Sequence, residues 1–186
     1  YLNFMGEKVA ENLLPLVTTT SAHTLRDTLR ALRDLGADEV ILVPTTRDEL
    51  LEAVANGQGD LAAGNLTVTE ARLQRVDFVA PRDAKPNREI VLSGAKAAPL
   101  ATAEALSGKT VHVRWTSSYH DSLVALNQRL AQGGKPAIKL VAVPDELEDE
   151  DMMEMLNVGL LDYIVVDDWK ARMWAQVLPK ITLNEG

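Results

Sequence analysis

Short apolar runs alternate with helical patterns along the chain. A helix is predicted before Gly36, where Leu25, Leu29 and Leu32 share a face, and another over 47–56. A third is predicted over 119–131, with Leu123, Leu126 and Leu130 on one face, and the acidic run 148–151 opens a fourth. Strands are predicted at 38–43, in the stretch from Gly59, at 89–92, 110–115 and 137–143, and in the run from Leu161. Such alternation is typical of βαβ units, so the pattern predicts an α/β fold with largely parallel sheet.

A polar, turn-rich stretch at 82–87 interrupts this pattern. The alternation of strands and helices resumes after it. We therefore expect two lobes, 1–88 and 89–186, each a mainly parallel sheet flanked by helices. The segments near Ala80 and Glu89 are the predicted hinge.

The stretch 59–72 runs from a predicted strand through small and hydroxyl residues into a helix start that carries Arg72. Backbone N–H groups at a helix N-terminus attract anions, and an arginine one turn later can add a bidentate fork for a carboxylate. Thr69 can equally be a plain N-cap, with Arg72 a solvated residue of the first turn. The residues alone leave both interpretations open.

Two carboxylates, Asp167 and Asp168, end the apolar run that begins at Leu161. In open α/β sheets, ligands bind at the carboxyl ends of strands. An anion pocket in one lobe and a strand-end carboxylate in the other would suit a zwitterion such as an amino acid. The alternative is that these aspartates cap the helix that begins near Trp169.

Composition narrows the class of protein. The chain has 186 residues, is 46% hydrophobic and contains no cysteine, which excludes disulfides, thiolate metal sites and cysteine nucleophiles. A net charge of −8 argues against binding to nucleic acid. The sequence holds no apolar run near the roughly 18 residues of a membrane helix and no signal peptide, so an exported form would have lost its leader.

No catalytic residue, metal or cofactor is predicted. Ser118, His120 and Asp121 stand at one helix start and point in different directions, unlike a catalytic triad. The run 148–151 lacks the glycine turn of a calcium loop and indicates a solvated helix start that complements the dipole. His112 alternates with valines on a strand, which favours a solvent-facing or hydrogen-bonded residue.

The segment 59–81 resembles the signature of the family 3 extracytoplasmic solute-binding proteins. It contains their Gly-Asp strand, Thr-x-x-Arg turn and Val-Asp-Phe-x-x-Pro exit in the same order. Segments at 106–119, 147–160 and 165–177 are similar to the solute-binding-like domain at the front of membrane-bound lytic transglycosylase F and its relatives. The resemblance implies a two-lobed, periplasmic binding protein type II-like fold.

The resemblance also implies a set of ligand-binding residues. In amino-acid binders of the family, the counterparts of Asn65 and Thr67 contact the ligand's ammonium or carboxylate, and that of Arg72 clamps the carboxylate. The second lobe would add hydroxyls and N–H groups from Thr116, Ser117 and Ser118, and Asp167 as the ammonium acceptor. Trp115 stands where relatives have a small residue or lysine, which indicates a bulkier cleft wall or an aromatic of the lobe's core or rim.

The function implied is non-catalytic binding of an amino acid or cell-wall peptide in a cleft between the lobes. The chain would act in the periplasm or outside the cytoplasm, either as a receptor for an ABC permease or as the sensor of a linked catalytic domain. One alternative is a degenerate fold that serves as a protein-interaction module. Another is a dehydratase or lyase derived from a binding protein, with Glu70 or Asp168 as its acid or base.

Two departures from the family pattern stand out. Relatives carry a hairpin whose aromatic residue covers the ligand, and the counterpart here, at 13–23, is short. The chain also stops at Gly186 without the segment that normally returns to the first lobe. We therefore expect a trimmed domain with a reduced lid.

Overall fold

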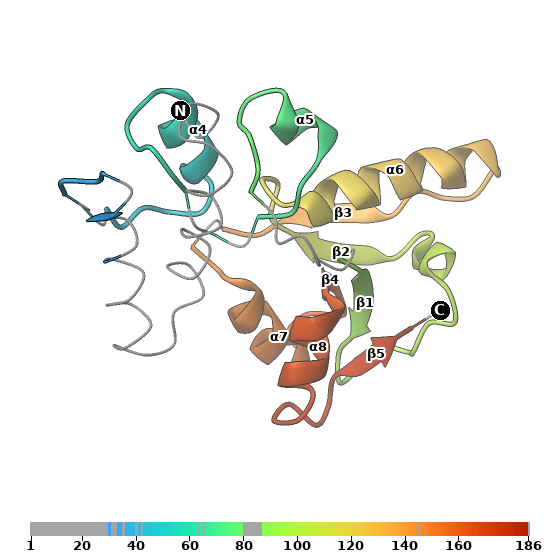
Figure 1. The fold of residues 1–186 in the computed structure, drawn as a ribbon. Helices are drawn as coiled ribbons and strands as arrows, with labels where there is room; N and C mark the ends of the chain where they lie inside the picture. Colours follow the sequence, from blue (N-terminus) through green and yellow to red (C-terminus); the bar gives the residue numbers. More distant parts are fainter. Residues whose placement is uncertain are drawn as a thin grey trace. The chain divides into compact units, whose positions relative to one another are not determined.

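The computed structural model describes residues 30, 33–34, 36–39, 41, 43–62, 64, 66–79, 87–144 and 146–185. The chain divides into two compact units, Tyr1–Lys85 and Pro86–Gly186. Most of the regular structure shown in Figure 1 belongs to the second unit.

A three-stranded sheet lies at the centre of the second unit. Strand β1 (Glu89–Ser93) pairs antiparallel with β4 (Tyr163–Asp167) on one side and with β5 (Thr182–Asn184) on the other. Strands β4 and β5 therefore run in the same direction, with β1 inserted between them. The mainly parallel sheet that the alternation predicted is thus interrupted by β1, which runs opposite to both of its neighbours.

The predicted parallel pairing is confirmed at β2 (Thr110–Val113) and β3 (Lys139–Ala142). Helix α6 (Ser118–Gln132) connects these two strands, as a parallel crossover requires. Strand β2 also lies beside β4. The helix predicted over 119–131 is confirmed, and Figure 1 shows it running alongside the β2–β3 pair.

Two further helices flank β4. Helix α7 (Asp149–Asn157) precedes the strand, and α8 (Asp168–Trp174) follows it. The first turn of α7 holds three acidic residues, and after its last residue Gly159 adopts a positive φ of 77°, a conformation that favours glycine. A short 3₁₀ helix, Ala103–Leu106, lies between β1 and β2.

The central sheet buries both of its faces. Val91 of β1 and Val165 of β4 belong to one hydrophobic cluster, whereas their neighbours Leu92 and Ile164 belong to a second. Successive side chains of a strand point to opposite faces, so the two clusters lie on opposite sides of the sheet. This explains why every residue of β4 is buried.

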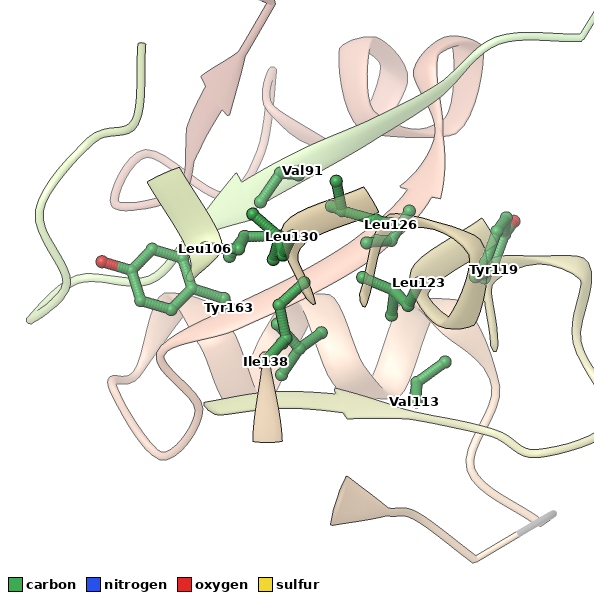
Figure 2. Packing of buried hydrophobic residues seen from close by; sticks show 11 residues of the cluster. Val91, Leu106, Val113, Tyr119, Leu123, Leu126, Leu130, Ile138 and Tyr163 are labelled. Carbon is green, nitrogen blue, oxygen red and sulfur yellow. The ribbon is translucent and has the colours of Figure 1, made fainter. Parts of the chain in front are cut away.

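Helix α6 covers the first face and α7 with α8 covers the second. Leu123, Leu126 and Leu130 of α6 pack in the first cluster, which confirms the helix face expected from their spacing (Figure 2). Met152, Met153 and Leu156 of α7 and Ala171 of α8 pack in the second cluster.

The first unit contains α4 (Leu50–Ala55) and α5 (Glu70–Leu73) among its described residues. Helix α4 confirms the core of the helix predicted over 47–56. The strands predicted at 38–43 and from Gly59 are wrong for the described residues, which form no strand there. A strand needs a paired neighbour and a covered face, and Ile41 and Val43 have exposed fractions of 72% and 71%.

Several sequence predictions fall outside the described residues. They concern the helix face of Leu25, Leu29 and Leu32, the short segment at 13–23, the ligand residue Asn65 and the hinge residue Ala80.

Two leucines four residues apart, one in α7 and one in the turn after it, provide a test of the second cluster. Leu156 is fully buried, whereas Leu160 has an exposed fraction of 70%. Leu156→Ala should lower the free energy of unfolding by about 2–5 kcal/mol, because it removes packed methyl groups and leaves a cavity. Urea unfolding followed by tryptophan fluorescence measures this, since Trp115, Trp169 and Trp174 all lie in this unit.

Leu160→Ala is the matched control and should change the same free energy by less than about 0.5 kcal/mol. Equal losses for the two variants would contradict the packing described.

Candidate functional site

In the first unit, the structure brings two predicted ligand residues, Thr67 and Arg72, together. Thr69 is the N-cap of α5, and its side chain accepts a hydrogen bond from the N–H of Arg72 at 3.3 Å. The Arg72 Nη1 atom in turn donates to the carbonyl of Thr67 at 2.7 Å. The N-cap interpretation of Thr69 is therefore confirmed, but Arg72 is half-buried rather than solvated.

Helix α5 has only four residues, so its dipole is weak. The Arg72 guanidinium is consequently the group that an anion would meet at this place, rather than a helix N-terminus. Its contact with the Thr67 carbonyl fixes one end of the guanidinium fork.

In the second unit, the predicted turn precedes α6. Ser117 is the N-cap of this helix, and its Oγ accepts from the N–H of His120 at 3.3 Å. The same Oγ donates to the carbonyl of Arg114 at 2.7 Å. Thr116 is exposed. The side chain of Ser117 thus holds the turn together, while Thr116 presents its surface to solvent.

Ser118 connects this turn to the central sheet. It is buried, and its Oγ donates to Oε1 of Glu89 at 2.9 Å. Glu89 stands directly opposite Asp167 in the β1–β4 pair. The structure therefore gathers the predicted turn and the predicted ammonium acceptor at one end of this pair.

Asp167 is a buried carboxylate, with an exposed fraction of 5%. Its Oδ1 accepts from the side-chain amide of Asn87 at 2.7 Å. Among the residues the structure describes, no ion pair includes Asp167. It occupies the N-cap position of α8 without a capping hydrogen bond from its side chain, so capping is not what this carboxylate does.

A second buried carboxylate, Asp149, lies at the start of α7. Its Oδ1 binds Nη2 of Arg114 at 2.5 Å, and its Oδ2 binds Nζ of Lys170 at 2.6 Å. The Tyr119 hydroxyl donates to the same Oδ2 at 3.2 Å. The solvated helix start predicted for 148–151 is therefore wrong for Asp149, whose exposed fraction is 1%.

Sequence reasoning missed this network because its members are far apart in the chain. The available signals were Arg114 directly after a buried strand and Lys170 between apolar residues of a helix. An arginine or lysine side chain placed among buried residues needs a buried negative charge as its partner.

The Tyr119 hydroxyl keeps its proton in this environment. Burial, and then the negative charges of Asp149 and Asp167, raise the pKa of Tyr119 far above its usual value. The hydroxyl therefore remains a hydrogen-bond donor to Asp149 over the whole physiological pH range.

Ser118, His120 and Asp121 do not form a hydrogen-bonded triad, and Glu70 and Asp168 lie in different units. Ser118 donates to Glu89 rather than to His120, whose Nδ1 lies 3.7 Å from Oδ1 of the exposed Asp121. Glu70 is exposed on α5, and Asp168 lies 3.9 Å from Arg172.

The structure also shows the surroundings of two aromatic residues, His112 in β2 and Trp115 after it. Trp115 is half exposed and packs edge-on against His120, with ring centroids 4.4 Å apart, so it is a rim residue rather than a core residue. His112 is half-buried, and its buried Nδ1 finds no hydrogen-bond partner among the described residues, contrary to a fully hydrogen-bonded histidine. Burial lowers the pKa of His112.

The part of the chain that the structure describes contains no group of three or more metal-ligating side chains placed to hold a metal ion. It likewise contains no helix that is both long enough and apolar enough to cross a membrane.

The family model of the bacterial extracellular solute-binding proteins, family 3, matches residues 26–173. The chain belongs to this family, which confirms the resemblance based on the 59–81 signature. The family is one of solute binding, and its description places its members outside the cytoplasm.

Among curated proteins, the chain is similar to the membrane-bound lytic murein transglycosylase F of Saccharophagus degradans. The two are 29% identical over 154 residues, which is 81% of this chain and 28% of that protein. The chain therefore spans little more than a quarter of the length of this relative.

Solved structures show the fold. One of them is an ancestral arginine-binding protein bound to arginine, with a TM-score of 0.64 and 19% sequence identity. The match covers 94% of this chain and 67% of that protein chain. Another is the arginine-bound form of truncated ArgBP from T. maritima, with a TM-score of 0.62 and 24% sequence identity. This match covers 83% of this chain and 66% of that protein chain. These likenesses confirm the predicted α/β, type II-like binding fold.

Two aspartates in the first turns of different helices test the buried network. Asp149→Asn should lower the free energy of unfolding by about 3–5 kcal/mol, because it leaves Arg114 and Lys170 buried with too little negative charge. Asp121→Asn removes an exposed charge from the first turn of α6 and should cost less than about 1 kcal/mol. Urea unfolding measures both, and similar losses would contradict the assignment of Asp149.

The raised pKa of Tyr119 predicts a loss of stability at alkaline pH. Unfolded tyrosine ionises near pH 10, whereas folded Tyr119 stays protonated, so its contribution is complete below pH 10 and declines above it. The free energy of unfolding should fall more steeply with pH in the parent than in Tyr119→Phe, by about 0.7 kcal/mol per pH unit at pH 10, rising to about 1.4 kcal/mol per pH unit at pH 11.5. Parallel profiles would show that Tyr119 ionises freely in the fold.

Proposed function

We propose that this chain binds a small zwitterionic ligand, an amino acid or a cell-wall peptide, and does not transform it. Arg72 takes the ligand's carboxylate and Asp167 takes its ammonium group. Thr67 and Asn65 add contacts from the first unit, and Thr116, Ser117 and Ser118 add N–H groups and hydroxyls from the second.

The observation that carries this proposal is that Asp167 is buried without an ion-pair partner among the described residues. A carboxylate that is removed from water loses solvation and needs an opposite charge in exchange. Asp167 is buried, yet the hydrogen bond that it accepts comes from the neutral amide of Asn87. A ligand ammonium group would supply the missing positive charge.

Among the residues that the structure describes, the two buried cations of this unit do not fill this role. Arg114 binds Asp149 and Glu148, and Lys170 binds Asp149. Both are thus engaged with other carboxylates, which leaves the charge of Asp167 for a ligand.

Arg72 supports the other half of the proposal. One of its nitrogens is held by the Thr67 carbonyl, which reduces the side-chain freedom that binding would otherwise remove. A guanidinium restrained in this way suits the planar, two-oxygen geometry of a carboxylate.

Two biological roles fit such a binder, and we favour the sensor. The similarity to a part of lytic murein transglycosylase F supports a domain that reports a cell-wall fragment or amino acid to a linked catalytic domain in the periplasm. The alternative is a free receptor for an ABC permease. It is supported by a similar solved structure described as an amino acid ABC transporter substrate-binding protein from Streptococcus pneumoniae.

Matched charge variants test the ligand contacts. Asp167→Asn and Arg72→Ala should each weaken binding at least about 30-fold, because each removes one partner of a desolvated charge pair. A thermal-shift screen against L-amino acids, dipeptides and soluble cell-wall fragments identifies the ligand. A ligand present at about 100 times its Kd stabilises the folded protein by roughly 2.7 kcal/mol. Isothermal titration calorimetry then gives the affinities.

Asp162→Asn and Arg75→Ala are the controls, because both side chains are exposed and lie close in sequence to the residues tested. They should bind as the parent does. Unchanged affinity in both Asp167→Asn and Arg72→Ala would reject the assignment of the site.

A further inference from the structure

We propose that Tyr119 and Asp149 are positioning residues for ligand binding. They fix the end of β4, and with it the Asp167 carboxylate, relative to the turn before α6. The relevance of this positioning to binding rests on the proposed function above, whereas the positioning itself does not.

The end of β4 has an N–H group that the sheet does not use. The N–H of Asp168 donates to the carbonyl of Arg88 at 2.8 Å, on the side of β1. Neighbouring N–H groups of a strand point to opposite edges, so the N–H of Asp167 points away from β1. There it donates to the Tyr119 hydroxyl at 3.3 Å.

The Tyr119 hydroxyl has one proton, and that proton goes to Oδ2 of Asp149. The direction of the two hydrogen bonds is therefore fixed. Asp149 accepts from Tyr119, and Tyr119 accepts from the backbone of Asp167. The raised pKa of Tyr119 keeps the proton on the hydroxyl, so that it remains a donor.

Asp149 also holds the other predicted element of this unit. It binds the guanidinium of Arg114, whose carbonyl accepts a hydrogen bond from the Oγ of Ser117. It binds Lys170 as well, which lies in the first turn of α8, three residues after Asp167. One carboxylate on α7 thus restrains both elements that carry predicted ligand residues, although α7 itself carries none.

Two tyrosines of the same hydrophobic cluster allow a matched test. Tyr163→Phe also removes one hydroxyl, but this hydroxyl donates to the carbonyl of Ala98 instead of contacting Asp167. The side-chain amide of Asn87 reports the position of the Asp167 carboxylate, because it donates to Oδ1 of Asp167. Its ¹H–¹⁵N resonances can be followed by NMR without any ligand.

Tyr119→Phe should shift both the backbone amide of Asp167 and the side-chain amide of Asn87. Tyr163→Phe should leave both in place. A shift confined to the Asp167 backbone amide, with Asn87 unchanged in Tyr119→Phe, would overturn the proposal, because the carboxylate would not depend on the hydroxyl. Equal shifts in the two variants would also overturn it.

Hydrogen exchange in the unaltered chain gives a second measurement, which decides the question if Tyr119→Phe does not fold. The Asp167 amide sits at the N-cap position, where no intrahelical acceptor is available. Slow exchange, comparable to that of the β4 amides, supports the bond to Tyr119. Exchange at the rate of an exposed amide contradicts it.

Binding is measured separately with L-arginine and the other standard L-amino acids as probes. Tyr119→Phe should weaken the binding of any amino acid that the parent binds by about 5- to 10-fold. Tyr163→Phe should change it less than about twofold. If none of these probes binds the parent, it is the amino-acid form of the proposed function that fails, and the NMR comparison still decides the positioning.

Discussion

The second unit depends on keeping the charge of Asp149 satisfied away from water. Arg114 and Lys170 supply two cations, and Tyr119 supplies a neutral donor. Each of these residues comes from a different element, so the elements cannot separate without exposing an unpaired buried charge, which is costly. The network therefore sets the relative positions of α6, α7, α8 and the end of β4. These are the elements around the candidate site.

The same arrangement leaves Asp167 with a distinct electrostatic role. Its backbone is linked through Tyr119 to the network of the buried cations, yet these cations are engaged by Asp149 and Glu148. Asp167 remains a buried carboxylate with a neutral hydrogen-bond partner, Asn87. The central sheet makes this possible, because both of its faces are covered and every residue of β4 is buried, with Asp167 at the end of the strand. The carboxylate that stabilises the network and the carboxylate that we propose for the ligand are thus separate residues, eighteen positions apart in the sequence.

Local patterns predicted much of the second unit, including α6 from the spacing of Leu123, Leu126 and Leu130, and the strand that ends at Asp167. They did not predict the burial of Asp149, because an acidic helix start looks the same in sequence whether it faces water or cations 35 and 21 residues away. Nor did they predict β5, whose Asn184 is fixed by contacts to Val91 and Ser93. The strands expected in the first unit are absent from its described residues, because strand-forming residues need paired neighbours. The site residues of both units came from a family signature, and their ligand contacts stay predictions.

The central claim is that this chain recognises both charged ends of a small zwitterion. Calorimetric titration with an amino acid that binds, with its N-acetyl derivative and with its carboxamide would test it most directly. The derivatives lack the ammonium and the carboxylate charge, respectively. The account predicts that each binds at least about 30-fold more weakly than the amino acid, because Asp167 or Arg72 is left without its partner. An N-acetyl derivative that binds as tightly as the free amino acid would contradict the role given to Asp167.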